Sequence, residues 1–293
     1  MYCSPVPELP EVETIVRDIR PRLLGRRIQQ ARLFHDDVLR GVSRRRLLAT
    51  LKGKQIREVS RRAKHAVLLL DRHRLVVQPG MTGSLQVRRP RASNEPDYVV
   101  LQAQLDNGTE LFYRDVRRLG TLLLLDEPGW ADYDAALGPE PLAPDFTAPA
   151  FRQTLSTSRQ AIKKVLMDQK HLAGVGNIYA NEALFAAGID PSRAASTITP
   201  AEYDLLYREL RRILGAAVEA EGTTVRDYVT GTGQPGTFQL ELLVYGREGE
   251  PCRRCGTRLT GTHAIDGRIT VFCHRCQGRQ DGTPARRQVS RMK

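Results

Sequence analysis

The spacing of four cysteines near the C-terminus constrains this sequence more than any other feature. They form two Cys-x2-Cys pairs with seventeen residues between them, Cys252, Cys255, Cys273 and Cys276. Each pair places two thiolates on a tight turn and the spacer has the length of one β-hairpin, so four sulfurs can surround a tetrahedral Zn²⁺. Because four sulfur ligands leave no position for water, we expect one structural zinc ion and not a catalytic one. Four unrelated reduced cysteines are the alternative, which this spacing disfavours.

The charge of the chain points to a polyanionic partner. Its 293 residues include 45 lysines and arginines against 33 acidic residues, a net charge of +12. Nucleic acid and an anionic membrane surface both fit this balance. The expected zinc hairpin adds a basic surface that suits phosphates, formed by Arg253, Arg254, Arg258, His263 and Arg268.

No stretch of the sequence has the pattern of a membrane span or a signal peptide. The longest apolar runs, around Leu68 and Leu122, have the length of a strand and fall short of the roughly 18 residues that a span needs. The N-terminus lacks a basic region followed by a long apolar run. We therefore expect no membrane segment and a cytoplasmic protein, whose cysteines stay reduced.

The first half of the chain has the pattern of a β-sheet domain with one helix. Its clearest strand is Asp97–Asp106, in which apolar residues alternate with polar ones. Further strands are expected at Gln55–Arg62, His65–Asp71, Arg74–Gln78, Ser84–Arg88, Thr109–Tyr113 and Gly120–Asp126. Ahead of them, Pro10 suits the first turn of a helix whose apolar residues recur at helical spacing, Val12, Ile15, Val16 and Ile19. These patterns predict a β-sandwich or barrel with a flanking helix.

The second half begins as helices. Apolar stripes predict helices at Phe151–Asp168, Asn177–Ala187 and Pro200–Glu219. Thr223–Phe238 has little core material and indicates a mobile loop, and Arg279–Lys293 indicates a basic, disordered tail. The predicted fold class is therefore α+β with two domains, an N-terminal β-sandwich and a C-terminal helical bundle with a zinc hairpin. The expected boundaries are 7–142 for the sandwich, 143–149 for a linker, 150–239 for the helices, 240–278 for the zinc finger and 279–293 for the tail.

The turn Gly174–Ala180 opens the second predicted helix. A helix N-terminus presents free N–H groups, so a phosphate is one expected occupant. Simple capping of the helix by Asn177 is the alternative. Lys163 and Lys164 on the preceding helix, together with the positive net charge, favour contact with a DNA backbone.

Motifs along nearly the whole chain resemble one known family. They begin with Pro7–Thr14 and continue through Arg61–Lys64, Gly80–Leu85, Asp115–Gly120, Gly138–Leu142, Leu166–Asp168, Gly174–Ala180, Ala186–Ile189, Val244–Arg247 and the four cysteines. Together they resemble the bacterial formamidopyrimidine-DNA glycosylases, bifunctional enzymes that excise 8-oxoguanine and ring-opened purines. The resemblance implies a helix-two-turn-helix bundle, base excision repair of damaged double-stranded DNA, AP lyase activity, zinc and a monomer. The opening with Leu9 is similar to the oxidised-purine branch and not to the sister endonuclease VIII branch.

The resemblance implies catalytic roles near the sugar and its phosphates. Pro7 matches the family nucleophile, whose amine attacks C1′ and forms an iminium before β- and δ-elimination. Glu8 matches the general acid/base that acts on the deoxyribose ring oxygen, although a glutamate there also suits the positive end of a helix. Lys64 matches a lysine that contacts a phosphate and serves as an acid; a surface lysine in a basic run is the alternative. Arg268 and Asn177 join Lys64 in holding the phosphates.

Three residues match those that enter the duplex where the damaged base has left it, Met81, Arg117 and Leu119. Apolar side chains replace bases there, and an arginine fork pairs with the orphaned cytosine. For Met81 and Leu119 the alternative is an ordinary core position. The family often has phenylalanine at position 119 and histidine at Gln78, so lesion scanning or opposite-base choice is expected to differ. Thr223–Phe238 corresponds to the loop that closes over the flipped base.

Six residues precede Pro7, and a proline nitrogen inside a peptide bond is not a nucleophile. We expect translation to begin at Val6, since GTG is also an initiation codon read as methionine, which is removed before proline. Residues 1–6 are then a mis-assigned start. The alternative is a real extension on a catalytically inactive protein that binds lesions or abasic sites, or on an enzyme that uses a backup lysine. A zinc-ribbon transcription or RNA-binding factor would explain the cysteines and the charge but not Pro7–Thr14.

Overall fold

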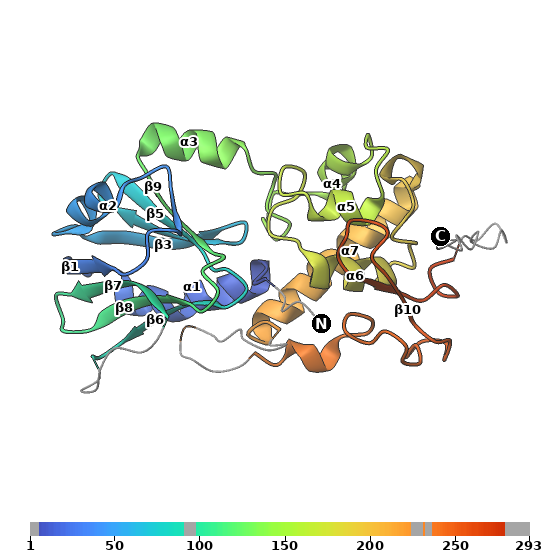
Figure 1. Ribbon diagram of the computed structural model, residues 1–293. Coiled ribbons are helices and arrows are strands. Elements are labelled where there is room, and N and C mark those ends of the chain that lie inside the picture. The colour runs from blue at the N-terminus through green and yellow to red at the C-terminus, as the bar shows by residue number, and fades with distance from the viewer. Residues whose placement is uncertain (1–5, 91–97, 224–230, 232–235, 279–293) are drawn as a thin grey trace, which may run out of the picture.

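A computed structural model describes residues 6–90, 98–223, 231 and 236–278. Figure 1 shows a β-rich N-terminal half and a helical C-terminal half that ends in a small hairpin. The predicted α+β class is therefore confirmed. Most of the predicted mobile loop and the whole predicted tail, residues 279–293, lie outside the described residues.

Two sheets form the N-terminal half. The first has the order β1-β7-β8-β6 and consists of β1 (Ile28–Leu33), β6 (Gly83–Arg88), β7 (Val99–Leu105) and β8 (Glu110–Asp115). The second has the order β2-β9-β5-β4-β3 and consists of β2 (Leu39–Arg40), β3 (Ile56–Arg62), β4 (His65–Leu70), β5 (His73–Gln78) and β9 (Thr121–Leu125). Apolar side chains from both sheets share one core, among them Leu68, Val77, Leu101 and Tyr113. The sheets therefore form the predicted sandwich.

The helix ahead of the sandwich is α1 (Leu9–Leu23). Pro10 lies in its first turn, and Glu11 Oε2 accepts a hydrogen bond of 2.9 Å from Glu8 N. The predicted apolar stripe is fully buried, Val12, Ile15, Val16 and Ile19. The helix packs on β3 and β6 and also contacts α7 (Pro200–Glu219) of the other half. Its N-terminal end therefore lies at the junction between the two halves.

Two short helices and two strands were not predicted. α2 (Arg44–Leu51) buries only Leu47 and Leu51, and α3 (Glu127–Ala135) buries none of its residues. Without an apolar stripe of several turns, neither helix produces the periodic signal on which the prediction depended. Their N-cap residues, Ser43 and Asp126, accept hydrogen bonds from backbone amides of the first turns. These two residue types, which are common at N-caps, were the sequence signal that could have indicated the helices. The unpredicted strands are β1 and β2.

The single helix predicted at Phe151–Asp168 is wrong, because two helices occupy this range. α4 (Ala148–Leu155) and α5 (Ile162–Met167) are separated by residues 156–161. In that break the Ser158 hydroxyl accepts a hydrogen bond from Gln160 N, and Gln160 O accepts one from Ala195 N. Serine competes with helical hydrogen bonding in this way. The later helices are α6 (Asn177–Ala186) and α7 (Pro200–Glu219), the second matching its predicted range.

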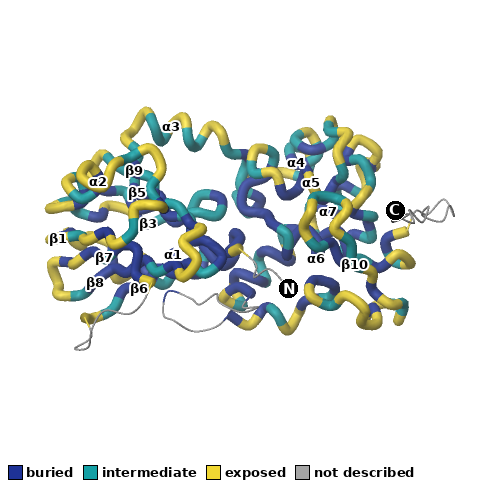
Figure 2. Tube along the Cα trace, in the orientation of Figure 1, coloured by how far each residue is buried: buried dark blue, intermediate teal, exposed yellow. Residues whose placement is uncertain are grey.

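The C-terminal hairpin, β10 (Thr260–Thr262) and β11 (Thr270–Phe272), is docked on α6. Helix α6 is buried along most of its length (Figure 2). Its Glu182 carboxylate accepts hydrogen bonds of 2.8–2.9 Å from the backbone amides of residues 243–245 just before the hairpin. Asn181 Oδ1 accepts a bond of 2.8 Å from Val271 N. Among the helices described, none is both long and apolar enough to cross a bilayer.

Candidate active site

Glu8 lies where the N-terminal ends of α1 and α6 meet. Its buried carboxylate accepts hydrogen bonds from Gly176 N at 2.7 Å and from Ile178 N at 2.9 Å. These amides belong to the first turn of α6, where a helix leaves its N–H groups without intrahelical partners. Glu8, and not a phosphate, therefore holds these two groups. Asn177 does not cap the helix either, since Gly176 is the N-cap; its half-buried side chain lies 3.3 Å from Asn181 Nδ2.

Lys64 approaches the same carboxylate from the turn between β3 and β4. A Cβ atom on Gly176 would overlap both the carboxyl carbon of Glu8 and Nζ of Lys64, so a side chain at this position would displace both groups. Burial raises the pKa of Glu8 and lowers that of Lys64, while the attraction between the two opposes both changes. The structure thus brings together two of the predicted catalytic residues, a buried acid and a half-buried base.

The turn that carries Lys64 is fixed to the segment that links the two halves. Ala63 adopts a φ of +52°, and its N–H donates to Glu140 Oε1 at 2.6 Å. The same carboxylate pairs with Arg61 at 2.6 Å and with Arg62 at 3.1 Å, and all three side chains are at most 20% exposed. Glu140 therefore sets the position of the Lys64 turn relative to the segment between α3 and α4.

Pro7 is buried at the same junction, while Val6 before it is exposed. Leu9 N donates to Gly174 O at 3.0 Å, which fixes the start of α1 against the turn before α6. The structure therefore places Pro7 beside Glu8, at the end of α1 that faces the helical half. Its role as nucleophile stays a prediction.

Glu11 is a site residue to which the sequence analysis gave no role. It is buried, and its Oε1 accepts hydrogen bonds from the Tyr179 hydroxyl at 2.5 Å and from Thr223 N at 2.7 Å. Burial, with a further contribution from the neighbouring charge of Glu8, raises the pKa of Glu11 to about 7. The capping-box spacing of Glu8 and Glu11 is the signal in the sequence that indicates this residue.

Lys163, predicted to contact DNA, has no exposed side-chain surface. Its Nζ donates to Thr270 Oγ1 at 2.7 Å and lies 3.5 Å from Asp266 Oδ1, so it ties α5 to the hairpin. Asp266 Oδ1 also accepts a hydrogen bond from Arg268 N at 3.1 Å. In this structure Lys163 therefore supports the backbone at Arg268 and does not present its charge to solvent. The Arg268 charge also lowers the pKa of Lys64, so the two residues lie within electrostatic reach.

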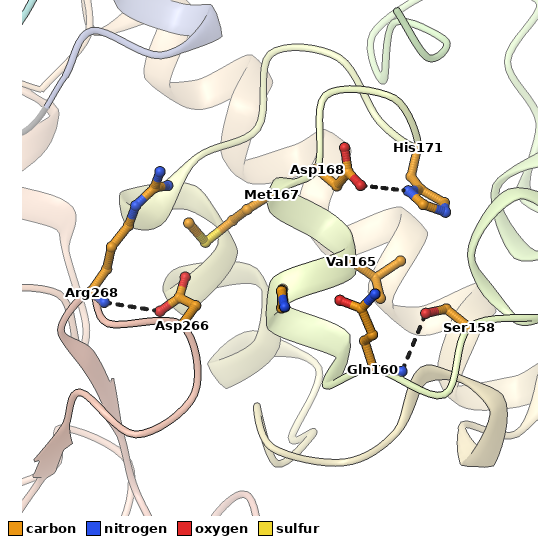
Figure 3. A pocket seen from close by; sticks show the side chains of 9 residues that line it. Ser158, Gln160, Val165, Met167, Asp168, His171, Asp266 and Arg268 are labelled. Atoms are coloured by element: carbon orange, nitrogen blue, oxygen red, sulfur yellow. Dashed lines mark hydrogen bonds and ion pairs between the residues drawn. The ribbon is translucent and has the colours of Figure 1, made fainter.

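Arg268 also lines a pocket of about 270 Å³ on the helical half. Figure 3 shows it beside the end of α5, with Asp168 paired to His171 Nδ1 at 3.1 Å. Lys164 contributes a second cation to the lining, and Asp168 and Asp266 contribute carboxylates. Because acidic and basic groups both line it, the pocket is not a uniformly positive surface of the kind that suits a DNA backbone.

Met81, Arg117 and Leu119 lie on two turns that touch. Met81 is in the turn between β5 and β6, and the other two are in the turn between β8 and β9. Arg117 N donates to Thr82 Oγ1 at 3.0 Å, which joins the turns. Leu119 is 52% exposed, which excludes an ordinary core position for it, whereas Met81 is buried.

Gln78, where the sequence departs from the family pattern, lies beside these turns. Its Oε1 accepts a hydrogen bond of 3.2 Å from the Thr121 hydroxyl, and its side chain also bonds to His65. Burial lowers the pKa of His65 to about 4, so this imidazole is neutral at physiological pH. Gln78 therefore contacts a neutral group and adds no charge to this surface.

The four C-terminal cysteines form a compact cluster of sulfur atoms. All four Sγ atoms lie within 4.8 Å of one another. The Sγ–Sγ distance is 3.9 Å between Cys252 and Cys276 and 3.5 Å between Cys255 and Cys273. A tetrahedral ion with metal–sulfur bonds of about 2.3 Å requires sulfurs about 3.8 Å apart, so the cluster fits Zn²⁺. The cluster thus has the geometry to hold a metal ion.

Comparison with known proteins identifies the family. Residues 6–122 match the formamidopyrimidine-DNA glycosylase N-terminal domain, and residues 137–229 match the H2TH domain of the same family. The formamidopyrimidine-DNA glycosylase of Stutzerimonas stutzeri is 44% identical over 275 residues, which cover 93% of this chain and 100% of that protein. This chain belongs to the formamidopyrimidine-DNA glycosylase family. The family member from Cronobacter sakazakii is 43% identical over 274 residues, with the same coverage.

Solved structures of family members have the same fold. Lactococcus lactis Fpg in complex with DNA that contains an abasic site matches with a TM-score of 0.85 at 33% identity, covering 93% of this chain and 100% of that chain. The MutM (Fpg) protein of Thermus thermophilus matches with a TM-score of 0.81 at 39% identity, covering 93% and 99%. Fpg structures in complex with damaged DNA support DNA as the partner.

The buried carboxyl of Glu11 predicts a pH dependence of stability. Because its pKa rises from 4.5 to about 7 on folding, its contribution is fully present below pH 4.5 and is lost as the pH rises through 7. That loss corresponds to roughly 3 kcal/mol, since each pKa unit is about 1.4 kcal/mol. Glu11→Gln cannot ionise and serves as the reference. We expect the melting temperature of the wild type to fall relative to that of Glu11→Gln between pH 5 and pH 8; parallel curves would contradict the assignment.

Proposed function

We propose that this glycosylase excises oxidised purines, 8-oxoguanine and formamidopyrimidines, from double-stranded DNA and then cuts the strand at the abasic site. As a member of its family, the chain is a DNA glycosylase of base excision repair. The observation that carries the chemical proposal is the buried Glu8 carboxyl, held by the first turn of α6 beside Lys64 and directly after Pro7. The proposal places the enzyme in the bacterial cytoplasm as a monomer on its DNA substrate.

Pro7 would attack the sugar as a free secondary amine. A terminal amine has a pKa near 8, against about 10.4 for lysine, so a useful fraction is unprotonated at neutral pH. Its nitrogen bonds to C1′ as the glycosidic bond breaks, and the base leaves with the bonding electrons and a proton. The ring oxygen takes a proton as the sugar opens, and the product is an iminium between Pro7 and C1′.

Glu8 and Lys64 supply the protons for these steps. Burial raises the pKa of Glu8, so its carboxylate takes up a proton more readily than an exposed glutamate does and can pass that proton to the ring oxygen. The iminium then acidifies the neighbouring C2′, so loss of a proton there expels first the 3′ phosphate and then, after a second elimination, the 5′ phosphate. Lys64, whose Nζ lies beside the same carboxylate, would protonate a leaving phosphate.

DNA would be held by phosphate contacts and by residues inserted into the duplex. Arg268 on the hairpin, Lys64 and Asn177 would hold the backbone around the lesion, a contact that positions without reading sequence. Arg117 and Leu119 are exposed on their turn and, with Met81, would fill the space that the flipped base leaves. A leucine at 119 lacks the stacking surface of an aromatic ring, so opposite-base choice depends more on Arg117.

The chemical proposal predicts a covalent intermediate. Borohydride should trap the enzyme on duplex DNA with 8-oxoguanine opposite cytosine, because it reduces the iminium to a stable amine. Glu8→Gln should slow base excision by about 10²-fold or more, the usual effect of removing a general acid. Its affinity for abasic-site DNA should change much less. Glu219→Gln, at an exposed position, is the control and should keep wild-type excision. An equal loss of excision and abasic-site binding in Glu8→Gln would mean that Glu8 only maintains the fold.

Pro7 can react only if the active protein begins with it. We propose that translation starts at Val6 and that removal of the initiator methionine exposes the proline amine. Terminal sequencing of the protein purified from its own organism should give Pro-Glu-Leu-Pro. A species that begins at Met1 and still forms the trapped complex would overturn this proposal and favour a lysine as nucleophile.

We propose that the cysteine cluster binds one structural Zn²⁺ that stiffens the hairpin carrying Arg268. Metal analysis should find about one zinc per chain. Cys273→Ser should release the zinc and abolish duplex binding, while the circular dichroism of the β-rich half stays, because the hairpin docks on α6 and not on the sandwich. Wild-type DNA affinity in a metal-free protein would refute the role.

A further inference from the structure

Two turns that are far apart in the sequence are built as one unit around Asp115. This residue ends β8 and has no exposed surface. Its Oδ1 accepts a hydrogen bond of 2.6 Å from the Thr82 hydroxyl in the turn after β5. Its Oδ2 accepts one of 2.8 Å from Gly120 N at the end of its own turn. One buried carboxylate therefore holds both turns.

The Thr82 hydroxyl completes the connection. It donates to Asp115 and accepts from Arg117 N at 3.0 Å, so both the proton and a lone pair of this oxygen are in use. The Tyr113 hydroxyl donates a further hydrogen bond to this carboxylate, at 3.3 Å from Asp115 Oδ2. Burial raises the pKa of Tyr113, so its hydroxyl keeps its proton and acts as a donor.

The backbones of the two turns approach too closely for side chains. A Cβ atom on Gly80 would lie 2.5 Å from Gly120 N and 2.7 Å from Asp115 Oδ2. Real Cβ atoms do not come so near to backbone nitrogen, so Gly80 must be glycine for the turns to meet. The contact is therefore rigid, because it is made between backbone atoms and a buried carboxylate.

A second and weaker interaction, an exposed ion pair, also holds the turn between β8 and β9. Arg118 pairs with Asp37 at 2.7 Å, but their side chains are 42% and 53% exposed. Exposed ion pairs of this kind contribute little, because solvent and salt screen them. The buried Asp115 network, and not this pair, fixes where the turn lies.

We propose that Asp115 and Thr82 are positioning residues that hold Met81 and the Arg117–Leu119 turn in one arrangement, so that the three side chains enter the duplex together. The inference rests on the proposed function, since it assumes that these side chains fill the vacated space. A rigid pair of turns fixes the backbone at Arg117 relative to the backbone at Met81. Selectivity for cytosine opposite the lesion then depends on residues that do not touch DNA.

Thr82→Val and Thr82→Ser form the matched test. Valine keeps the shape of threonine but removes the hydroxyl, whereas serine keeps the hydroxyl. We expect Thr82→Val to lower the preference for 8-oxoguanine opposite cytosine over adenine, measured as the ratio of kcat/KM, by about tenfold. Thr82→Ser should keep the wild-type ratio, and so should Asp37→Asn, which breaks only the exposed pair. Binding to undamaged duplex should be the same in all four proteins.

Fluorescence of 2-aminopurine beside an abasic site gives a second readout that a merely structural role would not move. Insertion unstacks this base and raises its emission, and we expect a reduced rise with Thr82→Val at full occupancy. Wild-type selectivity and emission in Thr82→Val, or an equal loss in Thr82→Ser or Asp37→Asn, would overturn the inference. If the wild type itself shows no preference for cytosine and no rise in emission, the proposed insertion fails instead.

Discussion

The site depends on one carboxylate placed between two helix N-termini. Glu8 immediately precedes α1, and its oxygens accept from amides of the first turn of α6, which lies 168 residues away in the sequence. Both helix ends carry partial positive charge and would repel each other without an anion between them. Burying the carboxylate is costly, and two amide donors and the Lys64 ammonium offset that cost. The interaction that joins the halves is therefore the one that positions the chemistry.

Other buried or half-buried carboxylates in this basic chain act in the same way. Glu11 accepts from Thr223 N, Glu140 from Ala63 N and Asp115 from Gly120 N, and Glu182 accepts from the amides before the hairpin. Each holds a loop backbone that would otherwise be free to move. Because these acids point inwards, the excess of lysine and arginine is left for the surface and a polyanion.

The sequence predicted the parts of this fold that follow local rules. Alternating strands, the apolar stripe of α1 and the cysteine spacing each follow from a periodicity or from a ligand geometry. Short helices without a stripe, such as α3, gave no such signal, and the break between α4 and α5 depends on a distant segment near Ala195. The family resemblance identified Glu8 and Lys64 as site residues. It did not predict which groups their side chains contact. Lys163 was predicted to contact DNA, but its side chain is buried against Thr270 and Asp266. This burial depends on tertiary packing, which no local sequence pattern reveals.

The glycine between Glu8 and Lys64 has a consequence for how such proteins can recombine. Gly176 belongs to the helical half, yet the two side chains that a Cβ there would displace come from the sandwich half. An exchange of halves between relatives would therefore preserve the site only if the incoming helical half brought glycine at this position. The two halves have separate cores. Even so, Gly176 of the helical half must be inherited together with Glu8 and Lys64 of the sandwich half if the site is to be preserved.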